Sequence, residues 1–391
     1  MNAETVILIL SISSVVKMGY RMTTGFFYDE RCFWHTGTGY AFAIPVGDLV
    51  QPLAAGGLPE DPETKRRIKN LLNVTGLAKE LNIGSAPNAT REDLERVHTA
   101  KYLDDFKLLS DLNGGEVVPF STTPFTQGGY ELASLSSGLV IQALTSVLSK
   151  QNKNAYALSR PPGHHCLPDK GMGFCLLANI SIAIKNVRAK GLAKRIAVVD
   201  WDVHHGNGTE AIFLEDPDVL TISIHQDRCF PPDTGNIEEQ GSGLGLGCNM
   251  NIPLPAGSGH LTYLEVMNSL VIPKLKKFQP EVIIVACGFD ASGVDPLSRM
   301  ICSAETFAIM TEQLMSAAKD ICQDKLVIAH EGGYSEVHVP FCAHAVLQKL
   351  SGSLVDAGDP LGPILDSQQP NHEMLSVYSG IIDRYRKYFD L

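Results

Sequence analysis

Four short apolar runs restrict the fold of this 391-residue chain more than any other feature of its sequence. None of them alternates apolar with polar residues, which is typical of strands buried on both faces of a parallel sheet. They are RIAVVDWD (195–202), VLTISIH (219–225), EVIIVACGFD (281–290) and KLVIAHEGG (325–333). Helical patterns occupy Glu131–Lys150, Ala178–Lys190, Leu261–Phe278 and Ala304–Ile321, the last behind Ser303 as its N-cap. The alternation predicts an α/β fold, a single domain with a mostly parallel central sheet flanked by helices.

Charge and cysteine content exclude several classes of protein. The chain has 43 acidic and 32 basic residues, a formal charge of -11, which argues against a nucleic-acid binder and mildly favours a cationic substrate. Its nine cysteines are scattered singly, without a CxxC pair, so neither a disulfide framework nor a cysteine zinc module is expected. These features predict an enzyme of the reducing cytoplasm.

The amino-terminal run VILILSISSVV (Val6–Val16) is too short to span a bilayer and lacks the basic segment of a secretory signal. We interpret residues 1–22 as an N-terminal extension, consistent with an artefact of start-site choice, and residues 23–391 as one folded domain. After this run, we expect no transmembrane helix in the sequence. Two loops rich in glycine and proline, 39–64 and 226–247, are predicted to border a binding site.

Polar residues follow the predicted strands at their carboxyl ends. Asp200, Asp202 and His204 lie on one side of the chain if the strand period of two continues, and Asp290 ends the later run. Ligands of parallel α/β sheets bind beyond these ends, so the polar groups are expected to converge. An aspartate, a histidine and a second aspartate suit a divalent metal, and three ligands leave a position open for water. Zinc is the leading candidate, and Fe(II) or Mn(II) also suit these ligand types.

A tandem histidine pair lies in RPPGHHCLPDKGMGFC (160–175), where a rigid Pro-Pro-Gly turn precedes His164 and His165. Near a bound metal, a histidine held by a polar partner is suited to take a proton from water and return one to a leaving group. Two polar residues are available to hold the imidazoles. Asn207 lies in the segment DVHHGNG (202–208), and Asp200 lies just before it.

The ordered motifs RPPGHH, MGFC, DWDVHHGNGT, SIHQ, GFDASGVDPL and EGGY resemble the zinc-dependent histone deacetylase family, in its class II branch. The segments YDERCFWHTG and VQPLAAGG are similar to bacterial histone deacetylase-like amidohydrolases. The resemblance covers about residues 24–352 and implies the arginase-deacetylase fold, with residues 23–391 as a deacetylase-like catalytic domain.

The resemblance also implies roles for individual residues. Asp202, His204 and Asp290 would bind one zinc ion. His164 and His165 would be the acid-base pair, hydrogen-bonded to Asp200 and Asn207. Tyr334 would donate a hydrogen bond to the substrate carbonyl as it becomes an oxyanion. An apolar slot would have Phe174 and Phe230 as walls, with Gly173 and Leu297 near its floor and rim. Potassium, which family members bind near the zinc, would take Asp200, Asp202, His204 and Ser223 at a first site and the segment of Phe213 at a second.

The implied activity is removal of acetyl or other short acyl groups from lysine side chains or related amines. The alternatives are an acetylpolyamine amidohydrolase and a catalytically silent module that binds acetyl-lysine. Polyamine specialists place an acid where this chain has Leu297, and arginase-like enzymes bind two manganese ions through acids where it has Gly206 and Ser292. The 39–64 loop resembles assembly segments of bacterial relatives, so a homo-oligomer, dimer or tetramer, is expected. We expect neither a nucleic-acid nor a membrane partner, and we interpret His330, before EGGY, as a buried, hydrogen-bonded histidine.

Overall fold

The four apolar runs form the centre of the fold. The structure is a computed structural model that describes residues 23–35, 40–41, 44–45 and 57–391. The runs become the strands β6 (Ile196–Asp200), β7 (Val219–Gln226), β9 (Val282–Cys287) and β10 (Leu326–His330). They are neighbours in one eight-stranded sheet of order β4-β1-β5-β10-β9-β6-β7-β8, in which every pairing is parallel. The predicted α/β fold with a mostly parallel sheet is confirmed.

The outer strands of the sheet were not predicted. They are β1 (Thr24–Phe27), β4 (Asn82–Gly84), β5 (Asn154–Ala157) and β8 (Asn249–Leu254). Three of them have four residues or fewer, and β8 carries two asparagines, so none forms an apolar run long enough to stand out. A separate antiparallel pair, β2 (Tyr40–Ala41) and β3 (Ile44–Pro45), falls in the predicted 39–64 loop, most of which lies outside the described residues, as does the predicted extension 1–22.

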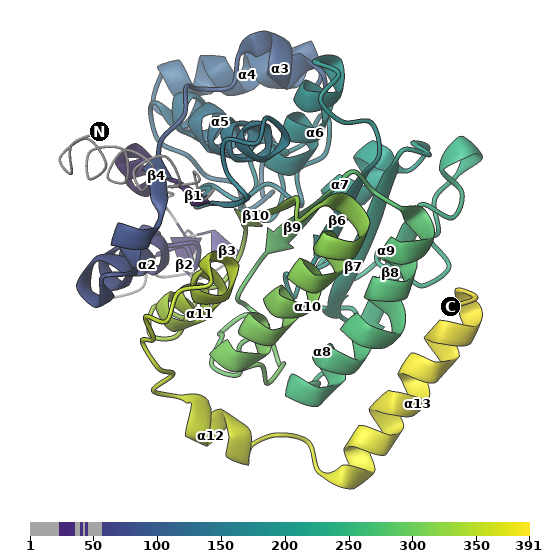
Figure 1. Cartoon of the computed structure of the whole chain (residues 1–391). Helices are drawn as coiled ribbons and strands as arrows, with labels where there is room; N and C mark the ends of the chain where they lie inside the picture. Colours follow the sequence, from purple (N-terminus) through teal and green to yellow (C-terminus); the bar gives the residue numbers. More distant parts are fainter. Residues whose placement is uncertain (1–22, 36–39, 42–43, 46–56) are drawn as a thin grey trace, which may run out of the picture.

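Helices cover both faces of the sheet (Figure 1). On one face α5 (Gly129–Leu148), α6 (Asn179–Ala189) and α7 (Asn207–Phe213) pack over an apolar cluster that includes Ile196 and Val198. On the other, α10 (Ala304–Cys322) and α11 (Val339–Ser351) pack over the opposite side chains of the same strands, with α2 (Pro62–Thr75) against α11. The remaining elements are η1 (Glu30–Trp34), η2 (Leu77–Glu80), α3 (Arg91–Glu95), α4 (Ala100–Asp111), η3 (Gly243–Gly245), α12 (Gly362–Ser367) and α13 (His372–Tyr388).

The predicted helix Leu261–Phe278 is present but interrupted. It consists of α8 (His260–Val266), a π-helical turn η4 (Met267–Val271) and α9 (Ile272–Phe278). Pro273 lacks the N–H that a continuous α-helix needs at this point, which accounts for a wider turn immediately before it. The N-cap predicted for α10 is confirmed, since Ser303 forms a capping box with Thr306.

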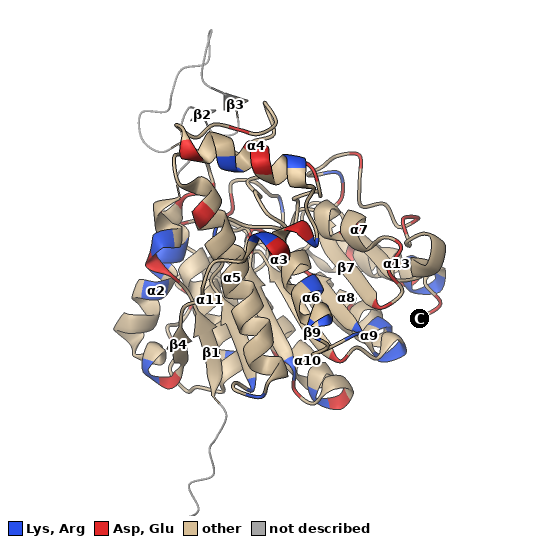
Figure 2. Cartoon of the chain, turned by 90° about the horizontal axis from the view of Figure 1, so that it is seen from above, with Lys and Arg blue, Asp and Glu red and all other residues tan. Residues whose placement is uncertain are grey.

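Helix α5 is, among the described residues, the one helix long and apolar enough to cross a membrane. Of its most apolar window, 67% is buried inside the protein, where it packs against α6, β1 and β5. Figure 2 shows charged residues of both signs along α4, whereas α5 is almost free of them. Its composition is therefore explained by its place in the core.

Candidate active site

Four neighbouring strands supply the polar residues that the sequence singled out. Asp200 is the last residue of β6, and Asp290 follows β9. Glu331 to Tyr334 follow β10, and the histidine pair follows β5. Because β5, β10, β9 and β6 are adjacent and parallel, their carboxyl ends lie at one edge of the sheet. The convergence predicted from the sequence is therefore present.

Asp202, His204 and Asp290 form a compact buried cluster. The Nδ1 atom of His204 lies 3.1 Å from Asp202 Oδ1 and 3.2 Å from Asp290 Oδ2. The three candidate ligand atoms all lie within 4.8 Å of one another. Nitrogen and carboxylate ligands in this number suit a metal site with an open position.

Strand β6 ends at Asp200. The predicted run 195–202 extended to Asp202, but the structure places Asp202, like His204, in the loop that follows the strand. Hydrogen bonds between side chains and backbone order this loop. Asp200 Oδ1 accepts from the backbone N–H of Asp202 at 3.0 Å, and Asp202 Oδ1 accepts from that of His204 at 2.9 Å. These bonds hold the aspartates in place after the sheet ladder has ended.

The electrostatics of the cluster favour a bound cation. Burial, and then the charge of Asp202, raises the pKa of Asp290 to about 6. Burial alone would lower the pKa of His204, but its contacts with Asp202 and Asp290 raise it well above its ordinary value. Two buried carboxylates around one imidazole thus create a strongly negative position, which a divalent ion can neutralise.

Two glycines shape the space around the carboxylates. A Cβ atom on Gly288 or on Gly332 would overlap Asp202 Oδ2, and one on Gly332 would also overlap Asp290 Oδ2. Any side chain at these positions would fill the space beside the candidate ligands. Gly332 belongs to the motif EGGY and Gly288 begins the motif GFDASGVDPL, but no role was predicted for either glycine.

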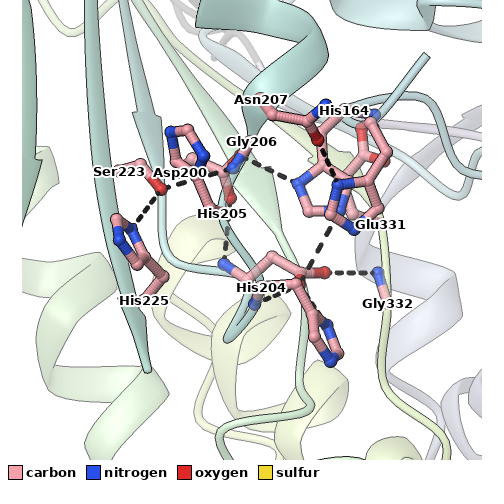
Figure 3. A network of polar contacts seen from close by, with 12 residues as sticks. His164, Asp200, His204, His205, Gly206, Asn207, Ser223, His225, Glu331 and Gly332 are labelled. Carbon is pink, nitrogen blue, oxygen red and sulfur yellow. Dashed lines mark hydrogen bonds and ion pairs between the residues drawn. The ribbon is translucent and has the colours of Figure 1, made fainter. Parts of the chain in front are cut away.

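The histidine pair lies beside this cluster and contacts the predicted partners; Figure 3 shows His164, Asp200 and Asn207. His164 Nδ1 donates to Asp200 Oδ2 at 3.0 Å, and His165 Nδ1 donates to Asn207 Oδ1 at 2.8 Å. The two imidazole rings are 3.9 Å apart between centroids. Both side chains are buried.

The two histidines have opposite pKa shifts. Burial acts to lower the pKa of His164, but the charges of Asp202 and Asp200 outweigh it and raise the value to about 10. Burial and the neighbouring charges of His164 and His204 lower the pKa of His165 well below its ordinary range. One imidazole of the pair is therefore held protonated and the other neutral, a suitable arrangement for acid-base work.

Glu331 supports the pair, and no role was predicted for it. Its Oε2 accepts from the backbone N–H groups of Gly163 at 2.6 Å and His164 at 3.1 Å (Figure 3). Burial raises the pKa of this carboxyl to about 7. The available signals were its place directly after a buried strand and its place in the motif EGGY.

An apolar slot of about 220 Å³ leads to the site. Phe230 lies edge-on to His165, with ring centroids 5.0 Å apart, and Phe174 lies edge-on to Tyr334 at 5.7 Å. Leu58 packs against Phe174 in the same small cluster. All four predicted slot residues line the cavity, and Thr122 and Cys229 were missed; the lining is Thr122, His165, Gly173, Phe174, His204, Cys229, Phe230, Leu297 and Tyr334.

His330 is buried and bonds through Nδ1 to the Tyr156 hydroxyl at 2.7 Å, as expected for a structural histidine, but its buried Nε2 has no hydrogen-bond partner among the described residues. Of the residues predicted for potassium, Ser223 pairs with Asp200 in the β6–β7 register, and its Oγ accepts from the Gly206 N–H at 3.4 Å. Phe213 is the last residue of α7, and its ring is buried in the core. The potassium sites stay a prediction.

Comparison with known proteins gives consistent matches. The histone deacetylase domain matches residues 58–350. The chain is 51% identical over 348 residues to a histone deacetylase-like amidohydrolase of Pseudomonas aeruginosa, and the match covers 89% of this chain and 91% of that protein. It is 38% identical over 265 residues to a probable deacetylase of Archaeoglobus fulgidus, which covers 68% and 72%. The crystal structure of the HDA15 HD domain has a TM-score of 0.79 at 30% identity, and the match covers 94% of this chain and 96% of that chain.

The parallel sheet, with this site at its carboxyl edge, is that of a protein with the arginase-deacetylase fold. The chain belongs to the histone deacetylase family. The family resemblance and the fold that were predicted from the sequence are thus confirmed. Membership in a family of deacetylases and amidohydrolases also supports the prediction that the protein is a hydrolase.

Proposed function

We propose that this protein is a zinc-dependent deacylase that removes acetyl or other short acyl groups from lysine side chains or related amines. One observation carries the proposal: His165, His204 and Tyr334 all border a single apolar slot of about 220 Å³. An apolar slot with a few polar groups at its inner end suits a methylene chain that terminates in an amide.

Asp202, His204 and Asp290 would hold the zinc. They supply nitrogen and oxygen ligands and they are buried. The two carboxylates share His204 as an ion-pair partner, and Asp202 also lies 3.8 Å from His164 Nε2. When bound there, zinc polarises the amide carbonyl and lowers the pKa of a water molecule.

The protein's own residues would perform the proton transfers. His165, which its environment keeps neutral, accepts the proton of the attacking water, and the pair returns a proton to the departing amine. Tyr334 stays protonated because burial and then the charges of Asp202 and Asp290 raise the pKa of its phenol well above 10.0. It can therefore donate a hydrogen bond to the carbonyl oxygen as negative charge develops.

Tyr334→Phe tests the proposal, because it removes the hydroxyl and keeps the ring. Loss of one preorganised oxyanion donor typically lowers turnover by about 100- to 1000-fold. We expect a loss of this size on a fluorogenic acetyl-lysine peptide, with metal content equal to that of the wild type. Turnover near the wild-type value would contradict the assignment. A wild-type protein that binds acetyl-lysine without hydrolysing it would instead favour the silent binding module.

Acetylpolyamine hydrolysis is the second candidate, and Leu297 argues against it. Leu297 lines the slot and packs with Phe174 and Tyr334. A leucine offers only apolar contact, whereas a carboxylate could pair with the distal ammonium of a polyamine. We expect acetyl-lysine peptides to have the higher kcat/KM, and Leu297→Glu to shift the ratio toward acetylspermidine. A preference of about tenfold for acetylspermidine in the wild type would overturn this choice of substrate class.

We further propose that the protein forms a homo-oligomer and acts in the cytoplasm. The proposed oligomer depends on the 39–64 loop, most of which lies outside the described residues. The proposed location depends on the unpaired cysteines, since all nine are free thiols in the structure. Analytical ultracentrifugation would test the proposed oligomer.

A further inference from the structure

Asp295 is a buried carboxyl outside the metal cluster and the histidine pair. It lies in the loop that connects β9 to α10, and 8% of its surface is exposed. Its Oδ2 accepts from the backbone N–H of Tyr334 at 2.8 Å, and its Oδ1 accepts from that of Leu297 at 2.9 Å. One carboxyl therefore joins the backbone of the residue with the proposed oxyanion donor to the backbone of the slot rim.

The segment before Tyr334 has little intrinsic rigidity. It contains two consecutive glycines, and Gly333 has a φ of 113°, a conformation that residues with side chains rarely adopt. The position of the Tyr334 backbone therefore depends on contacts from other segments. Since a displacement of about 1 Å in an active site can cost on the order of 100-fold in rate, such a contact has catalytic consequences.

We propose that Asp295 is a positioning residue for deacylation. Asp295 fixes the Tyr334 backbone so that the phenol meets the substrate carbonyl, and it fixes the backbone of Leu297 at the rim of the slot. This proposal rests on the function proposed above. Asp295 does not line the slot, so it acts through Tyr334 and Leu297 rather than on the substrate.

A general role in bracing the loop is the alternative, and the structure offers a control for it. Ser292, in the same loop, bonds through Oγ to His338 Nδ1 at 2.7 Å, and His338 Nε2 in turn contacts Asp359 at 3.1 Å. This second buried tie joins the loop to the start of α11 but makes no hydrogen bond with Tyr334. Ser292→Ala therefore loosens the loop without touching the Tyr334 backbone.

Asp295→Asn is the informative variant. Burial, and then the charge of Asp290, raises the pKa of Asp295 to about 8, so a neutral side chain of the same shape is tolerable there. The amide has one acceptor oxygen in place of two, so one backbone N–H must face its NH₂ group. We expect kcat to fall by about tenfold or more with unchanged metal content.

A double-mutant cycle with Tyr334→Phe separates positioning from bracing. Without the phenol only the Leu297 rim is left to position, so Asp295→Asn should lower kcat by less than about twofold in the Tyr334→Phe background. Ser292→Ala should cost less than about twofold in both backgrounds. Equal losses from Asp295→Asn in both backgrounds, or an equal loss from Ser292→Ala in the wild type, would overturn the proposal. Should Asp295→Asn not fold, Asp295→Glu keeps the carboxyl group, displaces both acceptor atoms, and should couple to Tyr334 in the same way.

A spectroscopic measurement reports positioning without activity. In protein labelled with 3-fluorotyrosine, the ¹⁹F signal of Tyr334, assigned by its loss in Tyr334→Phe, should shift or broaden in Asp295→Asn and stay unchanged in Ser292→Ala. An unchanged signal in Asp295→Asn would also overturn the proposal. If the wild type hydrolysed no acylated amine, the function would fail, while this measurement would still decide whether Asp295 fixes the Tyr334 ring.

Discussion

Two adjacent histidines in this protein have opposite pKa shifts, and their hydrogen-bond partners contribute to the difference. The charges of Asp202 and Asp200 raise the pKa of His164, which donates to Asp200. His165 donates to the amide of Asn207, whose oxygen orients the imidazole but adds no negative charge to stabilise the imidazolium. Burial and the charges of His164 and His204 therefore keep the pKa of His165 low.

Asn207→Asp tests whether the neutral amide of Asn207 helps to keep His165 unprotonated. A buried carboxylate 2.8 Å from His165 Nδ1 should raise the pKa of His165, because it favours the protonated ring. If His165 must be neutral to accept a proton, activity then needs a higher pH. We expect the acidic limb of the kcat/KM profile to move upward by about one pH unit or more.

Asn207→Ala is the control for lost orientation. It removes the hydrogen bond without adding charge, so it should lower kcat/KM at every pH and leave the acidic limb in place. An acidic limb that moves equally in both variants would contradict the electrostatic explanation.

At the scale of elements, the sequence predicted those strands that form long apolar runs. β6, β7, β9 and β10 have five to eight residues each and are buried throughout except for Gln226. Strands β1, β4 and β5 have four residues or fewer, and β8, although buried throughout, contains two asparagines and a proline, so local composition could not distinguish them from loops. The candidate site followed from polar residues at the ends of the long apolar strands.

The missed site residues have a common cause. Glu331 acts on the backbone of Gly163, Asp295 on that of Tyr334, and Gly288 leaves space for Asp202. Each effect joins segments far apart in the chain, so the motifs GFDASGVDPL and EGGY, which contain these residues, did not reveal the contacts.

Helix α2 depends on a buried ion network at its start. Glu60 Oε1 lies 3.1 Å from Lys65 Nζ and 3.0 Å from Arg160 Nε, and all three side chains are almost fully buried. The network joins α2 to the segment that leads to the histidine pair. Burial would raise the pKa of Glu60, but Arg160 and Lys65 lower it from 4.5 to about 2.

Glu60→Gln should destabilise the protein strongly at pH 7, by about 3–5 kcal/mol, because it leaves two buried cations without a counter-charge. The folded-state pKa of Glu60 is lowered, so its stabilisation is complete above pH 4.5 and is lost as the pH falls toward 2. We expect the difference between variant and wild type in urea denaturation to shrink over this range. Glu63→Gln is the control, since Glu63 pairs with Arg66 and Arg67 at the surface and should cost less than about 1 kcal/mol. A deficit for Glu60→Gln that is independent of pH would contradict this account.

In the whole molecule, the candidate metal ligands also connect loops. Asp202 Oδ2 accepts from the Gly332 N–H at 2.9 Å, after β10, and Asp290 Oδ1 accepts from the Val203 N–H at 2.7 Å, after β6. The same carboxylates that would bind a cation thus link three loops at the edge of the sheet. Their mutual repulsion, in a chain of net charge -11, opposes that arrangement when no cation is present.

Removal of metal should therefore lower the melting temperature as well as the activity. An ion that binds only the folded state stabilises it by about 2.7 kcal/mol at a concentration 100 times its Kd. We expect a chelator to lower Tm by several degrees, zinc to restore it, and elemental analysis to find about one divalent ion per chain. Asp202→Ala is the matched control: it removes a ligand, so its Tm should not respond to the chelator. An unchanged Tm in chelator-treated wild-type protein, or two tightly bound manganese ions per chain, would refute a single zinc site that holds these loops together.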